Sequence, residues 1–353
     1  MKKILKQVAG IDVAQDELVV CLGRMYDDLA TELYSHKTFP NTSKGFMSLV
    51  EWIGKLSEPD FCVRFVMEAT GVYHESLAYF LAERGDEVSI ILPNKISNYS
   101  RTLDVKTVTD KTASEAITRF GLERKLENWK PPKGIYKKLR QLTRERGQVV
   151  TFRTMAKNQL HAELSEVQPN KTSLVRLRKH ITFLEKQDKE IKEELAQLLK
   201  EDIEMKKVVV ILCSAPGVGL LTAATILGET NGFDLIRNKR QLTSYAGLDV
   251  REKQSGTSIK GKPRISKKGN KYLRKAMHMP ALAAIRSDDR FKAIFARIVA
   301  KHGIKMKAAV AVQRKLLEMM YTLYKTRTMY DKMYLVKNET EISENAGEAI
   351  LKN

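Results

Sequence analysis

The chain has 353 residues, and its 62 Lys and Arg against 42 Asp and Glu give a formal net charge of +20. This length supports two or three domains, and so basic a surface favours a nucleic-acid partner over an anionic membrane. Three scattered cysteines and six histidines show neither zinc-ligand spacing nor a disulfide framework, and there is no Walker-type phosphate loop. Zinc sites, disulfide scaffolds and nucleotide triphosphatases are therefore disfavoured. The cysteine pattern favours reduced thiols in a cytoplasmic protein.

Residues 1–130 are predicted to form an α/β domain with a mixed sheet. Apolar runs at 8–13 and 18–22 indicate two strands joined by a turn. Helical patterns follow at 44–56 and 72–84, and strand patterns at 61–67 and 87–92. The sheet and helices therefore alternate along this part of the chain.

Residues 131–205 are predicted to form a helical coiled-coil arm. Apolar side chains alternate at spacings of three and four, with polar Asp188 at the vacant position, and they are Leu174, Leu177, Ile181, Leu184, Ile191, Leu195 and Leu198. Such a heptad seam is typical of a coiled coil or of a long antiparallel hairpin. A helix that packs only on its own domain is the simpler alternative.

Residues 206–328 are predicted to be a helical DNA-binding domain, and residues 329–353 a flexible tail. The run 208–228 carries no charge and approaches the length of a membrane span. A Pro-Gly-Val-Gly turn in its middle favours two buried segments over a span.

Three acids occupy positions suited to a shared cation. Asp12 lies inside an apolar strand, Glu68 follows another strand, and Asp110 begins a helix. An unpaired buried carboxylate is costly, so Asp12 either has a structural partner or holds a cation, and Asp110 alone would suit a helix cap. Together they predict a site for Mg²⁺ or Mn²⁺, since hard cations prefer carboxylate oxygens.

Residues 251–275 contain ten Lys or Arg and one acid, Glu252, and glycines interrupt the run. A solvated surface is the usual explanation for a charge run, but a glycine-rich, nearly acid-free run favours phosphate contacts. The predicted nucleic-acid contacts here are Lys253, Lys260, Lys262, Arg264, Lys267, Lys268, Lys271 and Arg274.

Residues 213–223 resemble a helix-hairpin-helix turn. Gly217 and Gly219 would let backbone N–H groups at a helix start approach a phosphate. A buried turn that stabilises the domain explains the same glycines, and both roles are compatible.

Several motifs in order resemble the IS110 family of transposases. The RuvC-like domain of that family resembles this chain at Gly10-Ile11-Asp12-Val13, at Met67-Glu68-Ala69-Thr70-Gly71 and at Thr109-Asp110. The family's carboxy-terminal transposase domain resembles residues 242–248, 254–256 and 265–274. The resemblance covers roughly residues 7–325 and implies an RNase H/RuvC-like mixed sheet domain followed by a helical arm and a helical carboxy-terminal domain.

The resemblance also implies a chemistry. The family's acids are Asp, Glu, Asp and Asp, of which Asp12, Glu68 and Asp110 match three, whereas Ala113 stands at the fourth position. Glu115 and Asp104 are nearby acids that are left unassigned. Ser255, in Gln-Ser-Gly, matches the serine thought to attack the DNA phosphodiester, with Ser258 and Ser266 as the next candidates.

The resemblance implies three kinds of partner, which are double-stranded DNA at element ends and targets, a structured guide RNA, and further copies of the chain in a homodimer or homotetramer. The location that it implies is the bacterial cytoplasm, in association with the nucleoid. Two other functions remain open. A RuvC-type junction nuclease would use metal-bound water and would not need Ser255. A nucleic-acid-binding protein without catalysis would be consistent with Ala113.

Overall fold

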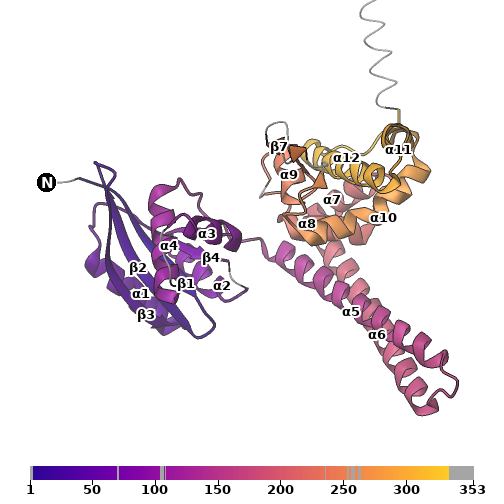
Figure 1. Cartoon of the computed structure of the whole chain (residues 1–353), viewed down its shortest axis with the longest axis horizontal. Helices are drawn as coiled ribbons and strands as arrows, with labels where there is room; N and C mark the ends of the chain where they lie inside the picture. Colours follow the sequence, from indigo (N-terminus) through magenta and orange to yellow (C-terminus); the bar gives the residue numbers. More distant parts are fainter. Residues whose placement is uncertain are drawn as a thin grey trace, which may run out of the picture. The chain divides into compact units, whose positions relative to one another are not determined.

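The structure is a computed structural model that describes residues 3–69, 71–103, 107, 109–234, 236–252, 254–255, 259–260 and 264–333, with only the backbone described at 254, 255, 259 and 260. The chain divides into two compact units, Met1–Pro131 and Pro132–Asn353 (Figure 1). The predicted boundary between residues 205 and 206 lies inside the second unit. Separate arm and DNA-binding domains therefore remain a prediction.

The first unit is built on a five-stranded sheet with the order β3-β2-β1-β4-β5. β1 is antiparallel to β2, and β2 is antiparallel to β3, whereas β1, β4 and β5 run parallel. The predicted mixed sheet is thus confirmed. The strands are β1 (Ile4–Val13), β2 (Glu17–Tyr26), β3 (Thr31–Pro40), β4 (Val63–Glu68) and β5 (Glu87–Ile91).

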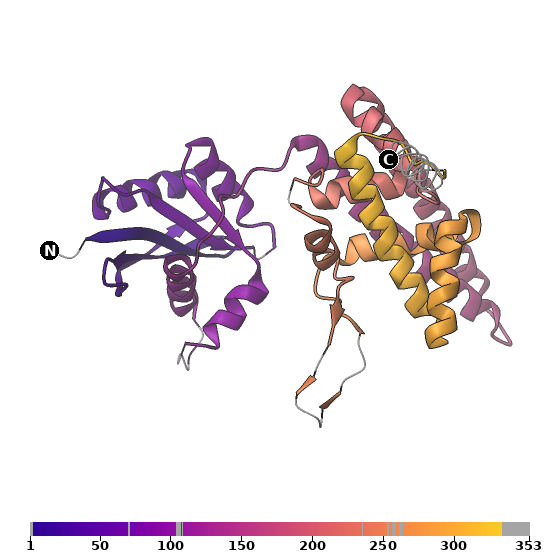
Figure 2. The same ribbon diagram turned by 90° about the horizontal axis from the view of Figure 1, so that it is seen from above.

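Helices cover both faces of this sheet (Figure 2). On one face, alternate residues of the strands pack with α1 (Ser43–Leu56) and α2 (Glu75–Glu83) in one apolar cluster. On the other face, a smaller cluster joins β1 and β4 to α3 (Pro93–Ser100) and α4 (Asp110–Glu123). Because successive side chains of a strand alternate in direction, residue parity decides which helices each side chain meets.

Gly10 lets α4 lie directly on β1. A Cβ at this position would come within 2.3 Å of Thr118 Oγ1 and 2.8 Å of the Ser114 carbonyl oxygen, both on α4. A larger residue would therefore displace the helix from the strand. The glycine fixes the height of α4, and with it the position of the helix start, above the sheet.

The strand β3 was not among the predicted elements. It pairs along its length with β2, but it is a sheet edge and most of its side chains are at least partly exposed. An edge strand of this kind lacks the apolar alternation that reveals a half-buried strand.

The described residues of the second unit are helical apart from four strands of two residues each. Its helices are α5 (Gly134–Leu164), α6 (Lys171–Glu201), α7 (Ile203–Cys213), α8 (Leu220–Thr230), α9 (Lys239–Tyr245), α10 (Lys271–Ser287), α11 (Asp289–His302) and α12 (Lys305–Thr326). One apolar cluster runs from the first turns of α5 through α8 and α10 to α12. None of the helices in the described part of the chain is long and apolar enough to span a bilayer.

The helices α5 and α6 form a long hairpin (Figure 1). The residues of α6 that are buried include Leu174, Ile181, Leu184, Ile191 and Leu195 of the predicted seam. The seam is therefore covered by α5 of the same chain. The expectation that it supplies a route for self-association loses its support, since the apolar stripe is already occupied.

The four short strands form a ribbon between α9 and α10. β6 (Val250–Arg251) pairs with β9 (Arg264–Ile265), and β7 (Gln254–Ser255) pairs with β8 (Ile259–Lys260), both antiparallel. Figure 2 shows these strands extending away from the helices of their unit. At the carboxyl end, Tyr330 donates a hydrogen bond from its hydroxyl to Asp288, and residues from 334 on are not described.

Candidate active site

Asp12 and Glu68 stand at the carboxyl ends of two neighbouring parallel strands. β1 and β4 are in register at Ile11 and Met67, so the two acids are the next residues along their strands. Ile11 and Met67 are fully buried on the α1 and α2 face. Because side chains alternate, Asp12 and Glu68 are directed to the face that α4 covers. This is the edge at which α/β sheets place their sites.

Asp110 is brought to the same edge by α4, which packs on β1. It is the first residue of the helix, and Thr109 before it accepts a hydrogen bond from the Thr112 amide in a capping box. The cap is thus provided by Thr109, so the helix does not need Asp110 as its N-cap. The carboxylate also gains from the positive end of the helix dipole.

The three carboxylates act on one another electrostatically. Burial, followed by the charges of Asp110 and Glu68, raises the pKa of Asp12 to about 6, while the Val13 backbone N–H opposes the shift. Like charges near a half-buried carboxylate favour its protonated form. The arrangement is a local excess of negative charge that a cation would relieve.

A hard divalent cation suits this donor set, which consists of carboxylate oxygens on rigid elements. In the described residues, however, no three His, Cys, Asp or Glu side chains are gathered closely enough to hold an ion as they stand. Asp12, Glu68 and Asp110 therefore do not form a ready-made ligand set. Metal binding and catalysis by these acids remain a prediction.

Ala113, at the position of the missing fourth acid, lines a cavity of about 650 Å³ together with Glu68. The other lining residues come mainly from α3 and the first turns of α4. Glu115 is turned elsewhere, since its Oε1 lies 3.1 Å from His36 Nε2 on β3. Asp104 falls in a gap of the described chain, so the structure offers no replacement for the fourth acid among the residues it describes.

Ser255 belongs to the second unit. Its backbone pairs with Ile259 in the ribbon, whereas its side chain and the whole of Ser258 lie beyond what the structure describes. Ser266 has a structural role, since its hydroxyl donates to Asp249 Oδ1 at 2.5 Å at the base of the ribbon. The hydroxyl of Ser266 is therefore engaged in the fold, and the other two candidate hydroxyls lie outside the described residues.

The base of the ribbon is tied to the arm through Glu229, which sequence analysis missed. The Glu229 carboxylate on α8 accepts hydrogen bonds from Arg144 on α5 at 2.7 and 2.8 Å, and from Asn270 Nδ2 at 2.7 Å. The side-chain oxygen of Asn270 caps α10, and the backbone N–H of Asn270 donates a hydrogen bond to the Tyr245 carbonyl. The only sequence signal for Glu229 was its place as the first charge after the uncharged run 208–228.

The predicted nucleic-acid contacts differ in how they are placed. Arg264, Lys267, Lys268 and Lys271 are exposed, as phosphate binding requires. Arg274 is half-buried and donates to the carbonyls of Ala246 and Gly269, which indicates a structural role. Lys260 is placed by its backbone in β8, and Lys253 and Lys262 lie outside the described residues.

The two glycines of the α7–α8 turn also differ. Gly217 has φ +73°, and a Cβ there would come within 2.5 Å of the Pro280 carbonyl oxygen on α10. Its role is therefore to allow a tight turn against α10. Gly219 begins α8, and a Cβ there would meet open space. Phosphate binding at this turn stays a prediction, and Gly219 is the better placed of the two.

Two protein-family models match the chain. One for DEDD transposases of the IS110 type, described as "Transposase", matches residues 9–169, and one described as "Transposase IS116/IS110/IS902 family" matches residues 209–296. The chain belongs to the IS110 family of transposases. The first model spans Asp12, Glu68 and Asp110, and the second spans the ribbon and its basic base.

Curated relatives of this transposase include two pilin gene-inverting proteins. That of Moraxella bovis is 28% identical over 328 residues, covering 93% of this chain and 98% of the relative. That of Moraxella lacunata is 27% identical over the same length. An uncharacterized 43.6 kDa protein of insertion element IS110 from Streptomyces coelicolor is 31% identical over 121 residues, which are 34% of this chain and 30% of that protein.

Solved structures give weaker matches. RuvC of Thermus thermophilus in complex with a Holliday junction matches with 10% identity and a TM-score of 0.27, over 35% of this chain and 99% of RuvC. A Ppx/GppA family member of Aquifex aeolicus matches with 11% identity and a TM-score of 0.22, over 96% of this chain and 99% of that protein.

Family membership confirms the predicted enzyme class. The chain is an IS110-family transposase with a catalytic DEDD domain built on a mixed sheet and a helical carboxy-terminal domain. The DEDD domain implies a divalent metal ion, and a transposase implies DNA binding. The serine chemistry, the guide RNA and the oligomeric state are not part of what the comparisons establish.

Proposed function

We propose that this transposase cuts and rejoins DNA ends through a covalent bond between Ser255 and DNA, assisted by Mg²⁺ or Mn²⁺ at Asp12, Glu68 and Asp110. The observation that supports the proposal is that Asp12 and Glu68 end two neighbouring parallel strands, while the charges of Asp110 and Glu68 contribute to the raised pKa of Asp12. The basic ribbon with the Ser255 backbone supports it from the second unit. A divalent ion held by the acids would supply Lewis-acid stabilisation of a phosphate.

In each step of this chemistry, one ester bond to phosphorus forms and one breaks. The Ser255 hydroxyl oxygen bonds to phosphorus, the bond from phosphorus to the leaving sugar oxygen breaks, and that oxygen takes up a proton in exchange for the one that serine loses. A sugar hydroxyl from the partner end then attacks the phosphoserine and releases Ser255. No nucleotide hydrolysis is needed, which agrees with the missing Walker-type loop.

Cations around the serine have a defined task in this scheme. Charge builds up on the nonbridging phosphate oxygens in the transition state, and preorganised positive groups stabilise it. Arg264, Lys267 and Lys268 follow Ser255 along the ribbon and are exposed. Their contacts to phosphates would also hold the strand in register with the serine.

Two further parts of the proposal concern partners. A guide RNA is suggested by the family resemblance, and a net charge of +20 is suited to binding it. A dimer or tetramer is suggested because joining two sites requires two nucleophiles. The pilin gene-inverting relatives carry a name that describes inversion, which is itself two rounds of cutting and rejoining.

A single assay tests the chemistry. Protein, Mg²⁺, labelled DNA from the flanks of the gene and transcribed flanking RNA are incubated, and protein–DNA adducts are separated on denaturing gels. We expect an adduct that disappears in Ser255→Ala and in Asp12→Asn and persists in Ser258→Ala. Omission of the RNA is expected to abolish it.

Other outcomes identify the alternatives. Free cut ends that persist in Ser255→Ala would show a RuvC-type hydrolysis. Intact DNA with normal binding would show a nucleic-acid-binding protein without catalysis, an outcome that is consistent with Ala113. Either result would reject the serine mechanism.

A further inference from the structure

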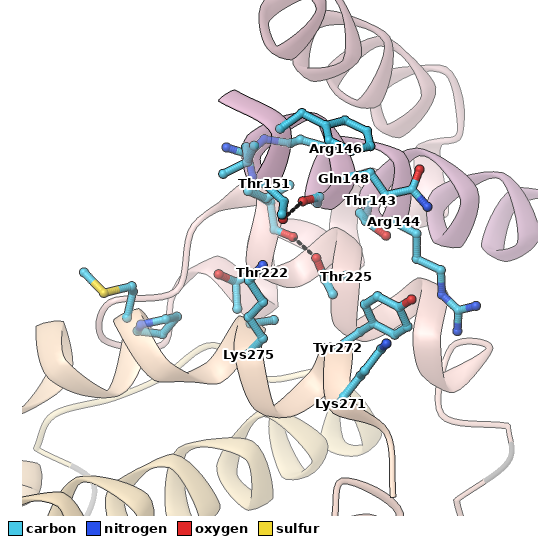
Figure 3. Close-up of a pocket in the computed structure, with 17 residues that line it drawn as sticks. Thr143, Arg144, Arg146, Gln148, Thr151, Thr222, Thr225, Lys271, Tyr272 and Lys275 are labelled. Carbon is cyan, nitrogen blue, oxygen red and sulfur yellow. Dashed lines mark hydrogen bonds between the residues drawn. The ribbon is translucent and has the colours of Figure 1, made fainter. Parts of the chain in front are cut away.

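A groove of about 700 Å³ crosses the second unit between three helices (Figure 3). Its walls are the middle of α5 from Thr143 to Phe152, the first turns of α8, and α10 from Lys271 to Pro280. None of these residues belongs to the acid site or to the ribbon. The groove begins where the ribbon ends, since α10 follows β9 after five residues.

Among the residues that the structure describes, four cations and no acid line the groove. The charges of two of these cations are neutralised by ion pairs, because Arg144 pairs with Glu229 and Arg146 Nε lies 2.7 Å from Asp188 Oδ1. Lys271 and Lys275 are exposed, one helical turn apart on α10, and neither has an ion-pair partner among the described residues. The groove therefore presents two uncompensated positive charges along one wall.

Apolar and aromatic surface lies beside these charges. Phe152 and Met279 line the groove with 54% and 69% of their surface exposed. Tyr272 is held in place by Arg144, whose guanidinium carbon is 4.4 Å from the ring centroid, and the Lys271 amine is 5.2 Å from the same ring. Figure 3 shows Lys271 and Tyr272 together at one end of the groove.

The positive charges together with the exposed aromatic and apolar side chains indicate which class of ligand the groove would bind. A positive track with aromatic side chains beside it is the way proteins bind unpaired nucleic acid, because phosphates meet cations and base faces meet aromatic rings. A duplex hides its base faces in the stack, so it would leave Phe152 and Met279 without a contact. A peptide could pack on the apolar wall, but a peptide need not carry negative charges, so it would not account for the two uncompensated lysines.

We propose that the groove between α5, α8 and α10 binds an unpaired polynucleotide strand, with phosphates at Lys271 and Lys275 and bases against Phe152 and Met279. The inference deepens the proposed function and rests on it, because cutting and rejoining ends requires strands to separate near Ser255. The exposed lysines at 267 and 268 connect the ribbon to the groove. A strand leaving the serine would follow them.

Binding is measured without chemistry, so that the test stands apart from the serine mechanism. Fluorescein-labelled 12-nucleotide single-stranded DNA, single-stranded RNA of the same sequence, and the DNA duplex are titrated with full-length Ser255→Ala protein without divalent ions. The two single-strand arms show which sugar the groove prefers. In the Lys271→Gln/Lys275→Gln background we expect single-strand affinity to fall about tenfold and duplex affinity by less than twofold.

Salt dependence and a matched charge control sharpen the test. Loss of two phosphate contacts lowers the slope of log K against log salt by about 1.4 for a single strand. Lys292→Gln/Lys301→Gln removes the same charge from exposed positions of α11 outside the groove and is expected to leave the slope unchanged. An equal change in the two double variants would overturn the proposal.

The apolar half of the groove has its own control. Phe152→Ala is expected to weaken single-strand binding about fivefold or more without changing the salt slope, since stacking carries no counterion release. Phe183→Ala removes an equally exposed phenylalanine from α6 outside the groove and should have no effect. If the strand affinity of every groove variant is unchanged, the groove serves another ligand, such as a peptide of a second copy. A normal strand result with no adduct in the cleavage assay would reject only the serine chemistry.

Discussion

Arg144 and Glu229 form a two-point ion pair between α5 and α8, with side-chain exposures of 41% and 1%. The two partners thus differ in exposure, because Arg144 is in contact with water and Glu229 is buried. Removing one partner of a buried pair is costly chiefly when the charge left behind is buried. We therefore expect Arg144→Gln to destabilise the second unit by about 3–5 kcal/mol and Glu229→Gln by less, about 1–3 kcal/mol.

Urea unfolding of the full chain, followed by circular dichroism, measures this difference. The double variant Arg144→Gln/Glu229→Gln is the control, and it should be more stable than Arg144→Gln alone because no charge is stranded. An Arg144→Gln variant as stable as Glu229→Gln would show that water reaches Glu229.

Ala113 provides a test of the missing fourth acid. Since it lines the cavity beside Glu68, a longer side chain there has room. Ala113→Asp is expected to tighten Mg²⁺ binding at least tenfold at pH 8 by isothermal titration calorimetry, because a further carboxylate joins the ligands. Ala113→Asn, which has the same shape without charge, should change the affinity much less. Equal affinities for both variants would place residue 113 away from the ion.

The pKa of Asp12 predicts a pH-dependent stability in the absence of metal. Its value rises from an ordinary 3.8 to about 6, through burial and the charges of Asp110 and Glu68. The folded state therefore binds a proton more tightly than the unfolded state, so stability is lost as the pH rises from about 4 to about 6. Two pKa units correspond to at most about 3 kcal/mol.

Asp12→Asn removes this cost. In EDTA we expect the variant to match the wild type at pH 4 and to exceed its unfolding free energy by about 1–3 kcal/mol at pH 7.5. Added Mg²⁺ should stabilise the wild type at pH 7.5 and leave Asp12→Asn unaffected. A variant that is less stable than the wild type at every pH would mean that Asp12 has a structural partner.

The sheet edge at which Asp12 and Glu68 stand could be predicted from the sequence, because each strand that ends there is short and buried. The apolar runs before Asp12 and Glu68 fix both strands, and parallel strands end at one edge. What the pattern cannot fix is the rotation of side chains, which depends on the ion. Asp12 and Glu68 therefore end neighbouring strands as the pattern indicates, while the sharing of one ion with Asp110 stays a prediction.

Contacts between segments that are distant along the chain could not be predicted from the sequence. The seam of α6 is visible as a heptad, but periodicity is the same whether its partner is α5 or a second chain. The ribbon at 250–265 was missed because its strands have two residues each and little apolar character. Arg144 and Glu229 are 85 residues apart, and no local pattern connects them.

Asp188 is a buried acid within the seam of the hairpin, and it carries the last prediction. Its side chain is 5% exposed and lies near Arg146 Nε at 2.7 Å, Lys192 Nζ at 2.8 Å and Arg153 at 3.4 Å. Burial alone would raise the pKa of Asp188, but the cations around it hold that pKa below its ordinary value. The carboxylate therefore contributes stability above about pH 4 that is lost as the pH falls through its lowered folded pKa.

At pH 7, Asp188→Asn is expected to lower the unfolding free energy by about 2–4 kcal/mol, since it leaves three cations along one face of the hairpin without an anion. Glu185→Gln is the matched control, because the Lys157–Glu185 pair of the same hairpin has a 2.8 Å contact but is exposed to water, which screens it, so its loss should cost much less than that of Asp188. Urea unfolding at pH 7 and pH 2 measures both, and the difference between Asp188→Asn and the wild type should shrink at pH 2. Equal costs for the two variants at pH 7 would show that burial adds nothing to the Asp188 cluster, and that the apolar residues of the seam hold the arm together on their own.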